Sequence, residues 1–108
     1  MDKLAGVGGD ALVVRMIDLF VKLSPERLEG ARRALGEGDL STVERLTHSL
    51  KSSAANVGAV RLRFRAEDAE LCANRGESAS ISALLDELEQ EVARVLLDLQ
   101  AARARHAR

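Results

Sequence analysis

The residue of this chain best suited to nucleophilic chemistry is a histidine within a run of small and charged residues. His48 lies in the segment LTHSLKSSAANVGA, residues 46–59, whereas the second histidine, His106, lies in the basic end of the sequence. An unperturbed imidazole has a pKa of about 6.5, so an exposed one is partly neutral at physiological pH and can attack phosphorus. His48 is therefore the candidate for any reaction that needs an imidazole nucleophile.

Apolar spacing predicts a helix around His48 and puts the imidazole on its solvent side. At about 100° per residue, the core-facing residues fall within an arc roughly 120° wide, and His48 lies about 150° from its centre. The arc contains Leu40, Val43, Leu46, Thr47, Leu50, Ala54 and Val57. A lone histidine on such a face is most often an ordinary solvated residue, so its neighbours decide the interpretation.

The neighbours of His48 at helical spacing are mostly small or cationic. They are Ser41, Glu44, Arg45, Lys51, Ser52 and Ala55. The ammonium of Lys51, one turn away, can pair with the oxygens of a phosphoryl group on His48. Ser52 and Ala55 leave the approach open, so the candidate docking surface for a partner protein comprises Ser41, Glu44, Arg45, Ser52 and Ala55.

Capping residues and glycines predict the order of the helices. We expect a flexible lead over residues 1–10, followed by a helix over about residues 11–23. Ser24-Pro25-Glu26 is typical of a new helix start, because serine can cap free amides and proline suits the first turn. The remaining expected helices run from there to Gly36, over residues 40–57, over residues 59–74, and from Ser78 or Ser80 towards a frayed basic tail, residues 103–108.

The composition favours an all-α protein. Alanine, leucine, glutamate and arginine abound, whereas the chain has two Phe and neither Trp nor Tyr. Short turns between helices favour antiparallel neighbours. We predict one domain over residues 1–108: an up-down-up-down antiparallel four-helix bundle, with an additional N-terminal helix packed across it.

Charge and cysteine content exclude several classes of protein. Sixteen basic and seventeen acidic residues leave a net charge of -1, and with only two aromatic residues for stacking we expect no nucleic-acid binding. The single cysteine, Cys72, cannot form an intramolecular disulfide, and we find no signal peptide and no apolar run of the roughly 20 residues that cross a bilayer. We expect a cytoplasmic protein without direct membrane insertion.

The sequence also lacks the motifs that proteins use to transfer a phosphoryl group from ATP. It contains no glycine-rich phosphate loop and no carboxylate cluster for magnesium, so we expect no bound cofactor and no metal site. Such a domain could hold a phosphoryl group that another protein supplies.

The segment from His48 to Ala59, with Leu62 and the acidic Glu70 after it, resembles the histidine-containing phosphotransfer (HPt) domains of multistep two-component phosphorelays. Residues 36–39, Phe20 and the helix order also look like that family. The resemblance implies that His48 accepts a phosphoryl group from the aspartate of one receiver domain and passes it to another. It also implies that Lys51 is the electrostatic partner, and that the receiver supplies the magnesium ion.

The implied partners are receiver domains of response regulators and a hybrid sensor histidine kinase, and we expect the protein itself to be a monomer. Departures from the family pattern are Ser52, where glycine is common, and Arg65 and Ala69, where bulky apolar residues are common. We expect Phe64 and Leu71 to pack under the first helix or to form part of a docking surface.

Two other interpretations stay open at this point. The bundle could be a phosphorylation-independent adaptor that docks a receiver or a kinase without phosphoryl transfer. It could also be a dimerising fragment of a histidine kinase, although such a fragment would normally provide two long helices followed by an ATP-binding domain.

Overall fold

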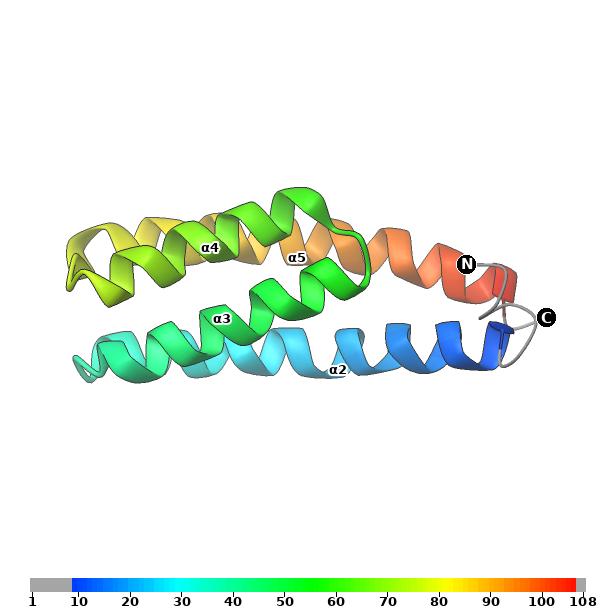
Figure 1. The fold of residues 1–108 in the computed structure, drawn as a ribbon, viewed down its shortest axis with the longest axis horizontal. Helices are drawn as coiled ribbons and strands as arrows, with labels where there is room; N and C mark the ends of the chain where they lie inside the picture. The colour runs from blue at the N-terminus through cyan, green and yellow to red at the C-terminus, as the bar shows by residue number, and fades with distance from the viewer. Residues whose placement is uncertain (1–8, 107–108) are drawn as a thin grey trace.

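The computed structural model describes residues 9–106, which form four helices and no strand. Figure 1 shows α2 (Gly9–Gly36), α3 (Leu40–Asn56), α4 (Val60–Asn74) and α5 (Ser78–His106). The all-α expectation is confirmed. None of the described helices is long and apolar enough to span a membrane.

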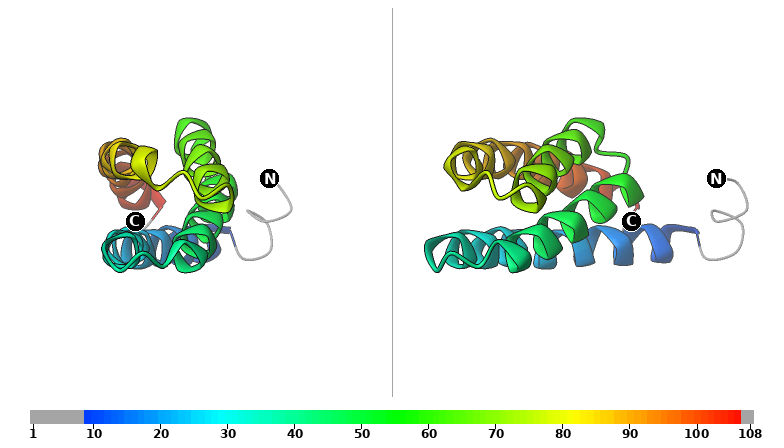
Figure 2. Two further views of the ribbon diagram at one scale, coloured as in Figure 1. Left: turned by 90° about the vertical axis from the view of Figure 1, so that its left-hand side faces the viewer. Right: turned by 60° about the vertical axis from the view of Figure 1, so that its left-hand side comes forward.

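The four helices form a ring in which each contacts the helices before and after it, and α2 also contacts α5. The colours in Figure 1 show that successive helices run in opposite directions, and the end-on view in Figure 2 shows the helices around a shared centre. The outer helices α2 and α5 have 28 and 29 residues, whereas α3 and α4 have 17 and 15. The α3–α4 pair therefore covers only one end of the α2–α5 pair.

The expected helix start at Ser24-Pro25-Glu26 is wrong, because α2 continues through Pro25. A single buried stripe extends on both sides of the proline and comprises Ile17, Phe20, Ser24, Leu28 and Ala31. Burial along this stripe offsets the cost of about 3 kcal/mol for proline inside a helix. The residues expected to form an additional helix across the bundle are the first part of α2.

Ser24 shows why the capping signal misled. Its side chain is fully buried, and its hydroxyl has no hydrogen-bond partner among the described residues. Serine therefore occupies a core position of a continuous helix, where it caps no free amide.

The three turns between the helices have the same backbone geometry. Gly38, Gly58 and Gly76 all have φ of 73°, in the left-handed region that glycine adopts without strain. In each turn the next amide bonds back to a carbonyl five residues earlier, for example Asp39 to Ala34 at 2.8 Å. The expected ends at Gly36 to Asp39 and at Gly58 are confirmed, and Asp39 caps α3 by accepting a bond from the Thr42 amide at 3.1 Å.

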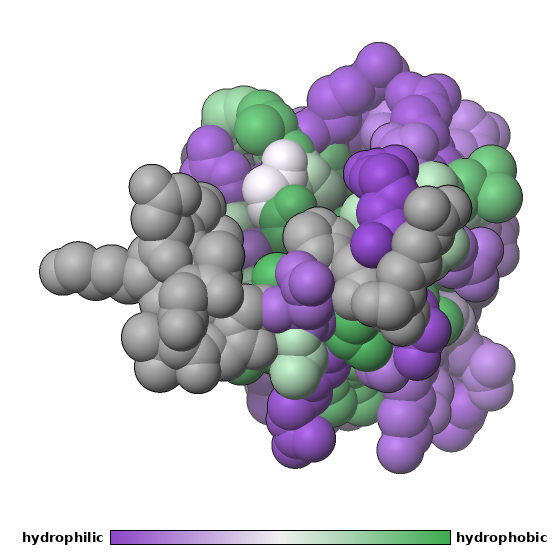
Figure 3. Space-filling view, turned by 90° about the vertical axis from the view of Figure 1, so that its right-hand side faces the viewer, coloured by the Kyte–Doolittle hydropathy of each residue, from purple (hydrophilic) through white to green (hydrophobic). Residues whose placement is uncertain are grey.

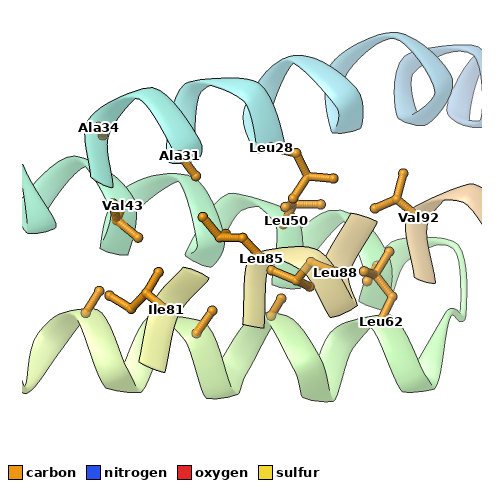
Figure 4. Packing of buried hydrophobic residues seen from close by; sticks show 14 of the residues in the cluster. Leu28, Ala31, Ala34, Val43, Leu50, Leu62, Ile81, Leu85, Leu88 and Val92 are labelled. Atoms are coloured by element: carbon orange, nitrogen blue, oxygen red, sulfur yellow. The ribbon is translucent and has the colours of Figure 1, made fainter. Parts of the chain in front are cut away.

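The core lies between all four helices at the end covered by α3 and α4. Figure 4 shows Leu50 of α3 and Leu62 of α4 near Leu85 and Leu88 of α5. Besides Leu62, helix α4 buries only alanines, namely Ala66, Ala69 and Ala73. Small side chains let α4 approach its neighbours closely.

Two apolar residues of α4 point away from the core. Phe64 is 51% exposed and Leu71 is 43% exposed, so neither packs under α2. The Arg63 guanidinium lies 4.6 Å from the centre of the Phe64 ring.

The structure describes residues 103–106 of the basic end, and these residues belong to helix α5. Helix α5 continues to His106, and the Arg103 Nε atom donates to Asp18 of α2 at 2.6 Å. Figure 3 views the molecule from this end, where hydrophilic side chains occupy much of the rim and apolar side chains are visible between them. Residues 1–8 of the predicted lead, and residues 107–108, lie outside the described residues.

Candidate functional site

Helix α3 holds His48 on the side opposite its buried face. Val43, Thr47, Leu50 and Ala54 are buried, whereas the His48 side chain is 58% exposed. The predicted orientation of the imidazole is confirmed. Because four buried residues fix the rotation of α3, the imidazole has a defined direction relative to the neighbouring helix α4.

A glutamate on α4 binds both His48 and Lys51. The Nδ1 atom of His48 lies 2.8 Å from Oε2 of Glu70, and the Lys51 Nζ atom lies 2.7 Å from Oε1 of the same carboxylate. The Glu70 side chain is only 17% exposed and that of Lys51 is 25% exposed. Each carboxylate oxygen therefore has its own partner on α3.

The pKa of Glu70 shows which form of the carboxyl group is present. Burial raises this pKa, but hydrogen bonds from Lys51 and His48 outweigh burial, and the pKa of Glu70 is lowered. The group is thus an ionised carboxylate at neutral pH, which can only accept hydrogen bonds. The Nδ1 atom of His48 must carry the donated hydrogen, so the Nε2 atom of the neutral ring keeps the lone pair.

The predicted docking residues around His48 differ in their exposure and in whether they line a depression at the imidazole. Ser41, Arg45, Ser52 and Ala55 are exposed, as expected, whereas Glu44 is half-buried. Six side chains line a shallow depression at the imidazole, namely Ser41, Glu44, Arg45, His48, Ser49 and Glu70. Ser52, Ala55 and Lys51 are not part of its lining.

Contacts from α4 are what sequence reasoning missed. Glu70 is one of the residues that carry the family resemblance, but its contacts with His48 and Lys51 of α3 were not predicted. The hydrogen bond from Asn74 Nδ2 to Glu44 Oε2 at 3.0 Å was not predicted either. The available signal was helical spacing, since Glu70 and Asn74 are four residues apart and lie on one side of α4. That spacing shows a shared face but not which residues of another helix it meets.

A helical bundle that holds an imidazole at its surface, with one ring nitrogen bonded to a carboxylate and the other free, can carry a phosphoryl group on that histidine. The Hpt domain family matches residues 15–98 of this chain. The chain belongs to this family, and its role is histidine phosphotransfer in a phosphorelay.

A solved structure agrees with this assignment. This chain is similar to the crystal structure of histidine-containing phosphotransfer protein B (HptB) from Pseudomonas aeruginosa PAO1. The two sequences are 35% identical, and the TM-score of the two structures is 0.87. The similarity covers 96% of this chain and 90% of the HptB chain. A comparison with curated protein sequences gives no match.

Proposed function

We propose that Nε2 of His48 accepts a phosphoryl group from the aspartyl phosphate of one receiver domain and gives it to the aspartate of another. The observation that carries this assignment is the 2.8 Å bond between Nδ1 and Glu70 on a ring that is 58% exposed. The bond places the ring hydrogen on Nδ1, so the free lone pair is on Nε2. The exposure of the ring makes it accessible to a docked protein.

The proposed step is a displacement at phosphorus. The Nε2 lone pair forms the N–P bond while the bond between phosphorus and the receiver's aspartate oxygen breaks, and the aspartate leaves as a carboxylate. The imidazole becomes positively charged as the new bond forms, and the nearby negative charge of Glu70 stabilises that charge. The reverse sequence of bond changes delivers the group to the second receiver.

Lys51 supports this step from the α4 side. Its ammonium favours the charged form of Glu70, and the same positive charge lies one helical turn from the phosphoryl group on His48. We assign the magnesium ion and its carboxylate ligands to the receiver. The proposed docking surface comprises Ser41, Glu44, Arg45, Ser52 and Ala55.

The same hypothesis includes a monomeric, cytoplasmic protein whose upstream donor is a receiver domain, free or part of a hybrid sensor kinase. The localisation rests on the single cysteine and the other compositional features given above.

The test is transfer of labelled phosphate from a panel of phosphorylated receiver domains. We expect acid-labile label on the wild-type protein and on His106→Gln, which keeps the site residue and loses the second histidine. We expect no label on His48→Gln, with helical content unchanged by circular dichroism. Equal labelling of wild type and His48→Gln would exclude His48, and binding without transfer to any variant would favour the adaptor.

A further inference from the structure

The two cations nearest His48 along α3 lie on opposite sides of it and have different partners. Arg45 precedes His48 by three residues and Lys51 follows it by three, so they lie about 60° to either side around the helix. The Lys51 ammonium faces α4 and contacts Glu70 at 2.7 Å, with its side chain 25% exposed. Its position is therefore set by a carboxylate.

Arg45 is exposed, and no carboxylate forms an ion pair with it in the part of the chain that the structure describes. It makes only a small contribution to the lowered pKa of Asp39, which results mainly from the hydrogen bonds of Thr42. The Asp39 carboxylate accepts from the Thr42 hydroxyl at 2.6 Å and from its amide at 3.1 Å. Asp39 thus caps α3 and leaves the guanidinium available.

The depression at His48 contains more negative charge than positive charge. Glu44 and Glu70 both line it, and both carboxylates would repel a phosphoryl group arriving at the imidazole. Arg45 is the one permanently cationic side chain in this lining, because Lys51 lies outside it. A cation on this open side of the ring would offset that repulsion.

We propose that Arg45 binds the phosphoryl group directly, with its guanidinium donating to two oxygens that do not bridge to nitrogen. This inference rests on the proposed role of His48. A guanidinium matches the spacing of two phosphoryl oxygens and stays charged at any physiological pH. Lys51 then acts at longer range and through Glu70, whereas Arg45 is a catalytic residue in contact with the transferred group.

The test avoids any dependence on the unknown receiver by using phosphoramidate as a small phosphoryl donor. In this reaction the N–P bond to His48 forms as the P–N bond of the donor breaks and ammonia leaves. Wild type, Arg45→Gln, Arg45→Lys and His48→Gln are compared for the initial rate of labelling. Arg15→Gln is the matched control, since it removes one exposed arginine from α2 and changes the net charge equally.

We expect Arg45→Gln to label about tenfold more slowly than wild type, because charge-assisted hydrogen bonds to the reacting group are lost. Arg45→Lys should lie between them, Arg15→Gln should match wild type, and His48→Gln should take up no label. The phosphorus NMR signal of the phosphohistidine should also shift in Arg45→Gln relative to Arg15→Gln.

Labelling of Arg45→Gln at the rate of Arg15→Gln, with an unshifted phosphorus signal, would overturn the role of Arg45 and leave His48 as the acceptor. Labelling of His48→Gln at the wild-type rate would instead overturn the acceptor assignment, and the role of Arg45 with it.

Discussion

The seam between α3 and α4 and the seam between α2 and α5 are both crossed by ionic contacts, but they use their carboxylates differently. At the α2–α5 seam, Arg32 binds Asp86 at 2.7 Å and Glu89 at 3.3 Å, and Arg103 binds Asp18 at 2.6 Å. At the α3–α4 seam, Glu70 binds a lysine and one nitrogen of a histidine. Only the second arrangement leaves a nucleophilic atom unused.

Burial strengthens this contrast. The side chains of Asp86 and Asp18 are 64% and 51% exposed, whereas that of Glu70 is 17% exposed. Exposed pairs contribute at most about 1 kcal/mol because water and salt screen them. A partly buried carboxylate interacts more strongly with its neighbours, so Glu70 can direct the chemistry of the imidazole while the α2–α5 pairs only help to hold two helices together.

The largest effect is expected when one carboxylate at each seam is replaced by an amide, Glu70 at the α3–α4 seam and Asp86 at the α2–α5 seam. In Glu70→Gln the amide can donate to Nδ1, which moves the ring hydrogen to Nε2 and blocks attack. We expect phosphoryl transfer from a receiver to fall roughly 10- to 100-fold, as for other partners that orient a functional histidine. Asp86→Asn should transfer at the wild-type rate, with stability changed by less than about 1 kcal/mol.

Urea unfolding of both variants separates the chemistry from the fold. A large loss of stability in Glu70→Gln that accounts for its slower transfer would contradict the comparison. So would equal slowing of transfer in both variants.

A smaller effect is expected in the pH dependence of stability. Because the folded-state pKa of Glu70 lies below its ordinary value of 4.5, the unfolded chain takes up a proton first as the pH falls. The stabilisation is therefore complete above pH 4.5 and is lost as the pH drops through the lower folded-state pKa. Melting temperatures measured from pH 7 to pH 3 should fall less steeply for Glu70→Gln than for wild type.

Asp18, at the α2–α5 seam, is the control carboxylate for the pH dependence expected of Glu70. The Arg103 hydrogen bond lowers the pKa of Asp18, so the sign is the same, but this pair is exposed and screened. Asp18→Asn should change the pH profile less than Glu70→Gln, and added salt should remove the difference from wild type. Identical profiles for wild type and Glu70→Gln would show that Glu70 is not held as a carboxylate by its partners.

The smallest effect is expected for Ser52→Gly, which introduces the glycine that the family resemblance leads us to expect at this position. Ser52 is exposed and lies outside the depression at His48, so its hydroxyl does not obstruct the imidazole. We expect transfer at least as fast as wild type and a loss of about 0.5 kcal/mol in the free energy of unfolding, because glycine is a poor helix former. A marked fall in transfer rate would show that the hydroxyl assists the reaction.

Sequence reasoning succeeded where one segment contains all the relevant physics. The turn at Gly38 and the cap at Asp39 follow from local backbone preferences, and the exposure of His48 follows from the spacing of its own helix. It failed at Pro25, where a local start signal was outweighed by a buried stripe on both sides. It also missed the Glu70 contacts, because pairing between two helices depends on their relative rotation and height, which neither helix specifies alone.

The geometry of the site depends on the size of the buried side chains of α4, which are mostly alanines. Ala69 precedes Glu70 and is fully buried. A larger side chain there would push α4 outwards and lengthen the reach from its carboxylate to the imidazole on α3. The orientation of the nucleophile can therefore change through a substitution that contacts neither the phosphoryl group nor the receiver, so activity can evolve in this fold from inside the bundle.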